Sequence, residues 1–378
     1  MYPVLRTVSN MLKWIEVNLG NVAYNTRQLR KFFNKNSKLI VAVKADGYGH
    51  GAVEIARVVL KNGADMLAVA NIDEALKLRK AKIKAPILIL NWTEPVRLKE
   101  IVKNNLTQTI FDYCSAFMLS AASVKMKKKT NIHVKIDTGM GRLGVPYKEV
   151  YEFTKRISGL NNLRIEGIFS HFSVAECDKG YTFRQFKNFK TVIDKLERSD
   201  IKIPLKHIAN SAALINYPGL RLNCARAGIS VYGVSPWGKK NILRFLKPAM
   251  SFKAKVASVK IIIKGDSVSY GRTFIAKRRS VIADIPVGYA NGYQRSLSNK
   301  AFVLIKGRQV PVIGTICMDQ CLIDVTGIKN VKPGDEVVLF GCQGKNEIRV
   351  EEVAQWAGTI GYEIITNIGR LVERIYIK

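Results

Sequence analysis

Short apolar runs alternate with amphipathic segments from residue 39 to residue 225 of the chain. A run such as residues 39–43 has no polar face, which is typical of strands that are buried on both sides in a parallel sheet. In the segments between them, apolar residues recur at every third or fourth position, which predicts helices with one face on the core. The predicted strands are residues 39–43, 66–70, 87–90, 107–111, 132–136, 165–170, 205–209 and 222–225. The predicted helices include residues 19–33, 52–62, 72–81 and 182–198.

Eight strands of this kind predict a closed (β/α)8 barrel of the TIM type, and hence an α/β fold. An open, doubly wound sheet is the alternative, although open sheets usually have fewer strands. Residues 14–18 precede the first predicted helix, so we expect the barrel domain to extend from residue 13 to residue 240.

The pattern changes after residue 240 to short strands joined by tight turns. Gly265, Gly307 and Gly334 lie between β-branched segments, where reversals of the chain require glycine. The strands are expected within residues 250–264, 281–287, 302–305, 321–325 and 336–340, and helical patterns follow at 353–357 and 362–365. We therefore predict a second, mainly β domain made of residues 241–378 together with residues 1–12.

The composition is that of a globular protein, with 47% hydrophobic and 24% charged residues in a chain of 378. No apolar stretch approaches the roughly 20 residues that span a bilayer, and the N-terminus lacks the apolar core of a signal peptide. We therefore expect a soluble cytoplasmic protein without a membrane partner. The six cysteines have no C-x-x-C spacing, so they predict free thiols and no metal site.

The formal net charge is +32, from 61 basic and 29 acidic residues, and this excess raises the possibility of a nucleic-acid-binding protein. The basic residues are dispersed, with small clusters at residues 125–129 and 277–279. No helix-turn-helix, zinc finger or RNP-like aromatic pattern accompanies them. We therefore interpret the charge as a solvated surface and expect no specific nucleic-acid partner.

Lys44 directly follows the first predicted barrel strand. TIM barrels hold their catalytic groups at the carboxyl ends of the strands. An amine held among apolar groups has a lowered pKa, and its neutral form can attack a carbonyl to form a Schiff base. Gly47 and Gly49 allow the backbone to approach a ligand, and Tyr48 offers a hydroxyl. The alternative is a lysine that only extends to solvent, as most lysines at strand ends do.

Polar groups follow four other predicted strands at the same end of the barrel. They are Asp137 to Arg142 after the fifth strand, His171 after the sixth, Ser211 after the seventh and Arg226 after the eighth. Each alone has a structural explanation, such as a backbone-bonded histidine, a helix N-cap or a salt bridge. Together, at the rim where barrels place catalytic groups, they favour an active site.

Four motifs resemble those of the alanine racemases, which are fold-type III enzymes that use pyridoxal 5′-phosphate (PLP). They are VAVKADGYGHG at residues 41–51, KIDTGMGRLG at 135–144, VSYG at 268–271 and CMDQ at 317–320. The resemblance extends from Trp14 to near the C-terminus, and so covers nearly the whole chain. It implies a PLP-dependent amino-acid racemase that acts as a homodimer with active sites shared between subunits, and that supplies D-alanine for peptidoglycan.

The resemblance also implies which residues bind the cofactor. Lys44 would hold PLP covalently, and Arg226 would face its pyridine nitrogen, with His171 linked to Arg226. Because a guanidinium keeps its proton, Arg226 would donate to an unprotonated ring nitrogen. The residues that resemble the phosphate ligands of the family are Tyr48, Ser211, Gly228, Ile229 and Tyr362.

Racemisation needs a base on each face of the substrate's α-carbon. The resemblance implies Lys44 for one face and Tyr270 from the partner subunit for the other, with His171 assisting Tyr270. The residues that it implies for substrate binding and access are Arg142, Met318 and Tyr289, with Lys135 as a side chain that is carbamylated in the family and then braces Arg142.

Three residues depart from the family pattern. Ala227 stands where proline is usual, Asn291 where aspartate follows Tyr289 and Ala290, and Glu176 where aspartate is usual near the substrate channel. A racemase with broader specificity, for serine or larger side chains, is therefore an alternative. A fold-type III decarboxylase is less favoured because the chain has no Gly-Gly pair, and a PLP-carrying binding protein would not need a β domain that bears Tyr270.

Overall fold

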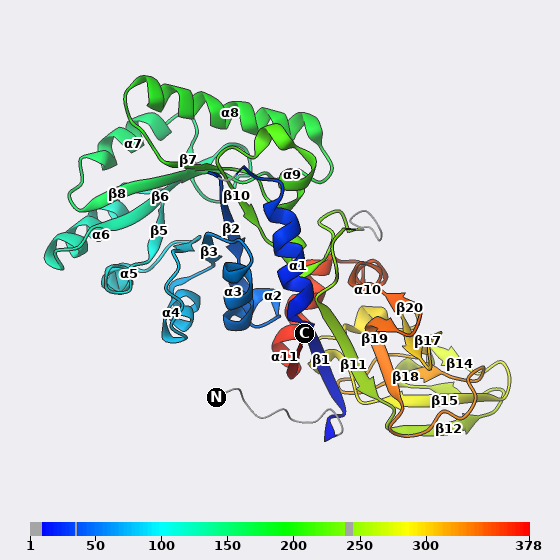
Figure 1. The fold of residues 1–378 in the computed structure, drawn as a ribbon. Helices are drawn as coiled ribbons and strands as arrows, with labels where there is room; N and C mark the ends of the chain where they lie inside the picture. Colours follow the sequence, from blue (N-terminus) through cyan, green and yellow to red (C-terminus); the bar gives the residue numbers. More distant parts are fainter. Residues whose placement is uncertain (1–9, 35, 239–244) are drawn as a thin grey trace. The chain divides into compact units, whose positions relative to one another are not determined.

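The computed structural model of the chain describes residues 10–34, 36–238 and 245–378 (Figure 1). Two compact units are present. The barrel unit comprises Ala23–Gly47 and Ala52–Val231, and the β unit comprises the described parts of Met1–Val22, Tyr48–Gly51 and Tyr232–Lys378. The predicted boundary between residues 240 and 241 falls outside the described residues, as do residues 1–9, and the domain limits stay a prediction.

The barrel unit contains the eight parallel strands expected from the apolar runs, which confirms the TIM-type fold (Figure 1). Parallel pairing runs continuously from one strand to the next, and pairing of β5 with β6 and of β2 with β10 closes the ring. The strands are β2 (Lys38–Ala42), β3 (Met66–Val69), β4 (Ile87–Ile89), β5 (Thr107–Ile110), β6 (Thr130–Asp137), β8 (Leu163–Phe169), β9 (Leu205–His207) and β10 (Cys224–Ala227). A two-residue strand, β7 (Val145–Pro146), pairs with the end of β6.

The helices of the barrel unit follow one another around the outside of these strands (Figure 1). Four of them begin at an Asn or Asp whose side chain accepts a hydrogen bond from a main-chain N–H in the first turn, which is the usual N-cap arrangement. Three of these caps, Asn71, Asp112 and Asn210, lie close behind a strand end and so fix where the βα loop stops, whereas Asp178 caps α8 after a longer loop. The helices are α3 (Ala52–Lys61), α4 (Ile72–Lys80), α5 (Leu98–Lys103), α6 (Tyr113–Lys125), α7 (Val150–Ser158), α8 (Lys179–Arg198) and α9 (Ser211–Asn216), with α1 (Leu19–Arg30) before the first barrel strand.

The β unit is built on a ten-stranded sheet, and a separate hairpin pairs β13 (Ser267–Val268) with β14 (Phe274–Ile275). The order in the sheet is β12-β15-β18-β17-β16-β19-β11-β1-β21, with β20 paired to β19. The strands are β1 (Lys13–Asn18), β11 (Met250–Lys255), β12 (Ser258–Ile262), β15 (Ser280–Ile285), β16 (Phe302–Ile305), β17 (Arg308–Ile313), β18 (Cys321–Asp324), β19 (Glu336–Gln343), β20 (Asn346–Ile348) and β21 (Arg374–Ile377). Two helices, α10 (Val350–Ala357) and α11 (Gly361–Leu371), match the predicted helical patterns.

Strand β1 lies in this sheet, whereas we expected it to open the barrel. It pairs antiparallel with β11 and parallel with β21. The reason is visible in its sequence, because the buried residues Ile15 and Val17 alternate with the partly exposed Glu16 and Asn18. Such alternation suits a sheet with one polar face, whereas a barrel strand such as β2 is buried on both faces.

In the described ranges, no helix has the length and apolar character needed to cross a membrane. The six cysteines are free thiols, of which Cys224 and Cys321 are buried. No group of His, Cys, Asp and Glu side chains placed to hold a metal ion is present among the described residues.

Candidate active site

Lys44 begins a left-handed turn at the end of β2. Ala45, Asp46, Gly47 and Tyr48 have φ values of 51°, 54°, 66° and 52°, all in the left-handed region. The turn is closed by a 2.8 Å hydrogen bond from the N–H of Gly47 to the carbonyl oxygen of Val43. A left-handed conformation costs about 1–2 kcal/mol for a residue other than glycine, so the surroundings must stabilise this turn. The sequence predicted a glycine-rich loop here but not its hand.

The amine of Lys44 has the environment that the sequence predicted. Burial lowers its pKa, the nearby positive charge of Arg142 lowers it further, and Arg226 adds to this effect, while Glu74 acts in the opposite direction. A lowered pKa makes a larger fraction of the amine neutral near pH 7. The neutral form is the one that can attack a carbonyl or accept a proton.

Arg226 on β10 is the centre of a buried polar chain. Only 6% of the residue is exposed, and its guanidinium donates to the carbonyl oxygen of Ser170 at 2.7 Å and to Nδ1 of His171 at 3.0 Å. It also donates to Nδ1 of His207, and Nε2 of His207 lies 2.9 Å from Nδ1 of His133. Nε2 of His133 is 3.4 Å from Glu166, longer than a normal hydrogen bond. Because a guanidinium can only donate, His171 and His207 must present unprotonated Nδ1 atoms to it.

The direction of these hydrogen bonds determines which ring nitrogen of each histidine carries the proton. His207 with a bare Nδ1 carries its proton on Nε2 and donates it to His133, whose own proton then lies on Nε2 facing Glu166. His171 likewise keeps a proton on Nε2, where it is free to donate. The neutral forms fit their surroundings, because burial, followed by the charge of Arg226, lowers the pKa of His171 and of His207 well below the usual value.

Positive charge is in excess at this end of the barrel. Lys135 on β6 is buried beneath the mouth, with its amine 4.7 Å from the centre of the Phe169 ring. Burial lowers its pKa well below the usual value, and Arg226 and Arg142 add to this shift. Burial also lowers the pKa of Arg226 to about 10. Among the described residues, the hydrogen-bond partners of Arg226 are histidine nitrogens and carbonyl oxygens rather than carboxylates. An anionic ligand would complement this set of groups.

Main-chain and hydroxyl groups suited to a phosphate lie beside β10. Ser211 is the first residue of α9, and its Oγ accepts a 3.0 Å hydrogen bond from the N–H of Gly228. Ile229 begins the 3-10 helix η4 (Ile229–Tyr232). Ala227, the first departure from the family pattern, is the buried last residue of β10 and pairs with Val41 of β2. The strand therefore runs regularly up to the predicted phosphate loop.

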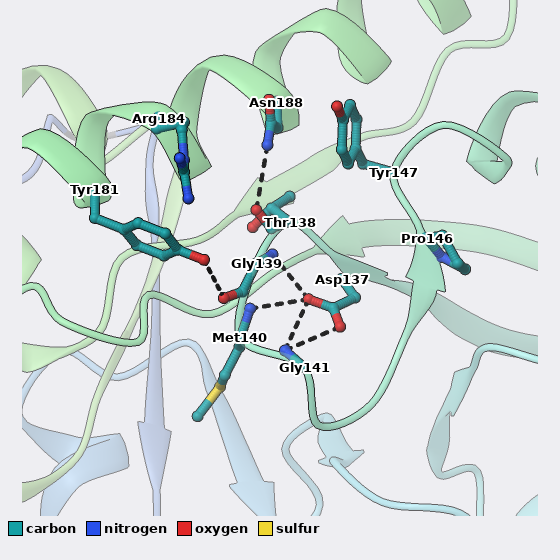
Figure 2. Close-up of a pocket in the computed structure, with 10 residues that line it drawn as sticks. All are labelled: Asp137, Thr138, Gly139, Met140, Gly141, Pro146, Tyr147, Tyr181, Arg184 and Asn188. Atoms are coloured by element: carbon teal, nitrogen blue, oxygen red, sulfur yellow. Dashed lines mark hydrogen bonds between the residues drawn. The ribbon is translucent and has the colours of Figure 1, made fainter.

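The loop after β6 carries Arg142, which is exposed. Its shape is set by the carboxylate of Asp137, which accepts hydrogen bonds from the N–H groups of Gly139, Met140 and Gly141 (Figure 2). Helix α8 braces the same loop, because the hydroxyl of Tyr181 donates to the carbonyl oxygen of Gly139 at 2.7 Å. Figure 2 shows these residues around a cavity of about 570 Å³. The residues that line it do not include Lys44, Ser211 or Arg226, so it is not the predicted cofactor site.

The predicted site residues of the β unit form two groups. Tyr48 and Tyr362 lie together, with ring centres 6.1 Å apart. Tyr270, Met318 and Tyr289 are surface residues, with exposed fractions of 71%, 58% and 42%.

The loops that carry Tyr289 and Met318 are joined by main-chain hydrogen bonds, from Tyr289 to the carbonyl oxygen of Cys317 and from Ala290 to that of Met318. Asn291, the second departure from the family pattern, accepts a hydrogen bond from the N–H of Gly288 and so holds this loop.

Sequence reasoning missed part of the site. It did not single out His133, His207, Glu166 or Glu74. The histidines had a usable signal, because His133 and Lys135 are two residues apart on β6 and so project to the same face of the strand. A polar residue on the inner face of a barrel strand needs a buried partner. No comparable signal marks Glu74, since an acidic residue in the first turn of a helix is common.

Comparisons with known proteins agree with this geometry. The family model "Alanine racemase, N-terminal domain" matches residues 17–236, and "Alanine racemase, C-terminal domain" matches residues 249–376. "Alanine racemase 1" of Clostridium acetobutylicum is 46% identical over 369 residues, which cover 97% of this chain and 95% of that protein. "Alanine racemase" of Methanococcus maripaludis is 43% identical over 96% of this chain and 98% of its own length.

Solved structures of alanine racemases are also similar to this chain. Alanine racemase of Clostridium difficile 630 superimposes with a TM-score of 0.91 at 37% identity, covering 97% of this chain and 96% of that chain. The Bacillus anthracis alanine racemase with bound L-Ala-P has a TM-score of 0.89 at 35% identity, covering 97% of this chain and 95% of that one.

Proposed function

Because the chain belongs to the alanine racemase family, we propose that it interconverts L-alanine and D-alanine with PLP held covalently by Lys44. The observation that carries the proposal is the position of Lys44. It follows a buried strand of a closed barrel, and burial lowers its pKa. The amine is therefore available for bonding to an aldehyde.

The residues present fit this cofactor. The hydroxyl of Ser211 and the N–H groups of Gly228 and Ile229 would hold its phosphate. In the β unit, the hydroxyls of Tyr48 and Tyr362 are the further candidate ligands. Bound PLP supplies an electron-withdrawing ring that stabilises negative charge on the α-carbon of an amino acid.

Arg226 would donate a hydrogen bond to the ring nitrogen. Its pKa of about 10 leaves the guanidinium protonated at neutral pH, so it donates a hydrogen bond but does not give up the proton that would make the ring nitrogen cationic. The buried histidines keep it in place, because His171 and His207 accept from its two terminal nitrogens. Arg226 would thus both orient the cofactor and limit how strongly the ring withdraws electrons.

Two bases would act on opposite faces of the α-carbon. Lys44 would accept or return the proton on one face, because its lowered pKa favours the neutral amine. Tyr270 of the partner subunit would act on the other face, which would make a homodimer necessary for catalysis. The exposure of Tyr270 supports this assignment, since its ring is available to a second chain. His171, whose Nε2 carries a proton, would donate to Tyr270 of the partner subunit.

Substrate recognition would fall to three further residues. Arg142 would pair with the carboxylate of the amino acid, and the main chain at Met318 would contact the same carboxylate. Tyr289 would narrow the channel that leads to the site. Exclusion by a narrow channel would select alanine better than a simple apolar pocket, in which one methylene discriminates by only about 1–3 kcal/mol. D-alanine made in this way would serve peptidoglycan synthesis.

Incubation of the PLP-loaded protein with L-alanine or D-alanine, followed by chiral chromatography, tests the proposal. We expect both reactions to approach the same mixture of enantiomers, and borohydride to fix the cofactor on the peptide that contains Lys44. Rates on alanine, serine and lysine measure breadth, and alanine should be the fastest. Failure to racemise alanine, or a cofactor fixed on another lysine, would contradict the proposal.

A further inference from the structure

Helix α4 contacts the left-handed turn after β2 through two side chains. Oε1 of Glu74 accepts a 2.7 Å hydrogen bond from the N–H of Ala45, the residue after Lys44. Three residues further along α4, the amine of Lys77 donates to Oδ1 of Asp46 at 2.8 Å. Residues three apart lie on the same face of a helix, so one face of α4 reaches the turn at two successive residues.

The carboxylate of Glu74 also joins two strand ends. Its second oxygen accepts a 2.7 Å hydrogen bond from the N–H of Ala70, which follows β3, while the first oxygen binds Ala45 after the neighbouring β2. The position of Glu74 is itself fixed, because its own N–H donates to the N-cap side chain of Asn71 at 3.0 Å. Hydrogen bonds to a carboxylate are shorter and stronger than those between neutral groups, which suits a backbone that must be kept in an unfavourable conformation.

The side chain of Asp46 connects the turn to α3 as well as to α4. Its Oδ1 accepts the N–H of Ala52 at 3.1 Å as well as the amine of Lys77, so it ties the turn to the first residue of α3. A left-handed turn that carries Lys44 is therefore held from α4 and from α3.

The electrostatic environment of Lys44 also involves Glu74. Within the barrel unit, the charged groups that shift the pKa of Lys44 come from three elements: Arg142 in the loop after β6, Arg226 on β10 and Glu74 on α4, which is the acid among them. Lys44 in turn contributes to lowering the pKa of His171, which follows β8. The two arginines lower the pKa of Lys44, whereas Glu74 raises it. Removal of the Glu74 charge should therefore shift Lys44 further toward its neutral form.

We propose that Glu74 is a positioning residue for Lys44, because it holds the backbone of the left-handed turn and places a negative charge near the amine. The placement does not depend on the reaction, but its importance for catalysis rests on the proposed function. The proposal predicts two separable effects of substitution, one on the order of the turn and one on the titration of Lys44.

The test compares Glu74→Gln, Glu74→Asp and, as a control, Asp73→Asn in the full-length chain without added cofactor. Asp73 is in the same turn of α4 but is exposed and pairs with Arg97, so its substitution removes a charge without touching the turn. Reaction of Lys44 with an amine-directed reagent across the pH range, followed by peptide mass spectrometry, gives its titration. Hydrogen exchange of the peptide around Ala45 gives the order of the turn.

We expect Glu74→Gln to move the titration of Lys44 to lower pH, to increase its labelling at pH 7 by about threefold or more, and to accelerate exchange at Ala45 about tenfold. Glu74→Asp keeps the negative charge on a shorter side chain. The titration of Lys44 should therefore match that of the parent chain, while hydrogen exchange at Ala45 stays fast. Glu74→Asp also keeps the test open if Glu74→Gln does not fold. Asp73→Asn should match the parent chain in both measurements.

Three results would overturn the proposal. They are an unchanged titration and exchange in Glu74→Gln, equal shifts in Asp73→Asn, or a titration that moves to higher pH because Lys44 has become solvated. Each of these measurements is made without substrate, so it is independent of whether the chain racemises alanine. Loss of the proposed function and loss of the proposed role of Glu74 can therefore be told apart. In the PLP-loaded enzyme with substrate bound, where Lys44 would act as a free base, Glu74→Gln should shift the acid limb of kcat to lower pH.

Discussion

The cluster around Arg226 in the barrel unit is buried and hydrogen-bonded, whereas Tyr270, Met318 and Tyr289 of the β unit are exposed. Arg226 and Lys135 are 6% and 7% exposed, while Tyr270 is 71% exposed. A buried cluster of polar groups requires that each member has a partner, so the barrel residues depend on one another. The exposed tyrosine has no such requirement in a single chain. This difference is consistent with the proposal above, in which the buried cluster belongs to one chain and Tyr270 acts on a second chain.

The same difference in burial predicts which substitutions weaken folding and which affect catalysis alone. Loss of a buried partner leaves polar groups unsatisfied in the core, so a change in the barrel cluster should weaken folding as well as catalysis. A change to an exposed residue such as Tyr270 should affect catalysis alone. The predictions below are directed at this contrast.

The largest effect is expected for Lys44→Ala. Removal of the amine eliminates both the covalent link to the cofactor and one base, so racemisation of alanine should fall by about 10³-fold or more. Chiral chromatography gives the rate, and the absorbance of the purified protein reports on the cofactor. Lys38→Ala, at the opposite and exposed end of β2, is the control and should retain full activity. If the Lys44 variant stayed active, another residue would hold the cofactor.

Tyr270→Phe should remove the second base without an effect on folding. We expect α-proton exchange in deuterated water to drop about 10²- to 10⁴-fold from one enantiomer of alanine, and far less from the other. The melting temperature should stay within the error of the measurement because the residue is exposed. Tyr151→Phe on α7 is a control. An equal loss for both enantiomers would break the two-base assignment.

Arg226→Lys should weaken folding, in contrast to Tyr270→Phe. An ammonium cannot reproduce the two-sided contacts of the guanidinium with His171 and His207, so at least one bond from a charged donor is lost in the core. We expect the free energy of unfolding to fall by about 1.5–3 kcal/mol, measured by urea denaturation. Arg57→Lys on the exposed face of α3 should change it by less than about 0.5 kcal/mol. If Arg226→Lys left the free energy of unfolding unchanged, the buried cluster would not stabilise the barrel.

Acid should destabilise the barrel unit through its buried histidines. Burial lowers the pKa of His133 and His207 in the folded chain, so below pH about 6.5 the unfolded chain binds more protons and stability falls as the pH falls. Each group contributes a slope of up to about 1.4 kcal/mol per pH unit. Urea denaturation at pH 7.5 and pH 5.5 should show this loss, and His207→Gln should flatten it. A stability that rises toward pH 5.5 would contradict the assignment of neutral histidines.

Much of the barrel could be predicted because short strand-like runs alternate with amphipathic helices, and all eight strands were found near their observed positions. The position of Lys44 followed from the rule that catalytic groups lie at strand ends. The left-handed turn could not be predicted, because Ala45 and Tyr48 disfavour that conformation. Its hand depends on contacts with α4, a helix whose sequence gives no sign of them.

The polar cluster illustrates a different limit. His133 and His207 were visible as polar residues in apolar strands, but their pairing depends on which strands become neighbours of β6 and β10 when the barrel closes. The position of β1 was missed for a related reason. Its alternating pattern indicated a sheet with a polar face, yet its place early in the chain suggested the barrel.

The most direct test of the account mixes two inactive proteins, Lys44→Ala and Tyr270→Phe, after they have been unfolded together and refolded with PLP. If each site combines Lys44 of one chain with Tyr270 of the other, half of the dimers carry one intact site, and the mixture should recover about a quarter of the parent activity. If both residues of a site come from the same chain, no intact site can form, and a mixture as inactive as its components would contradict the account.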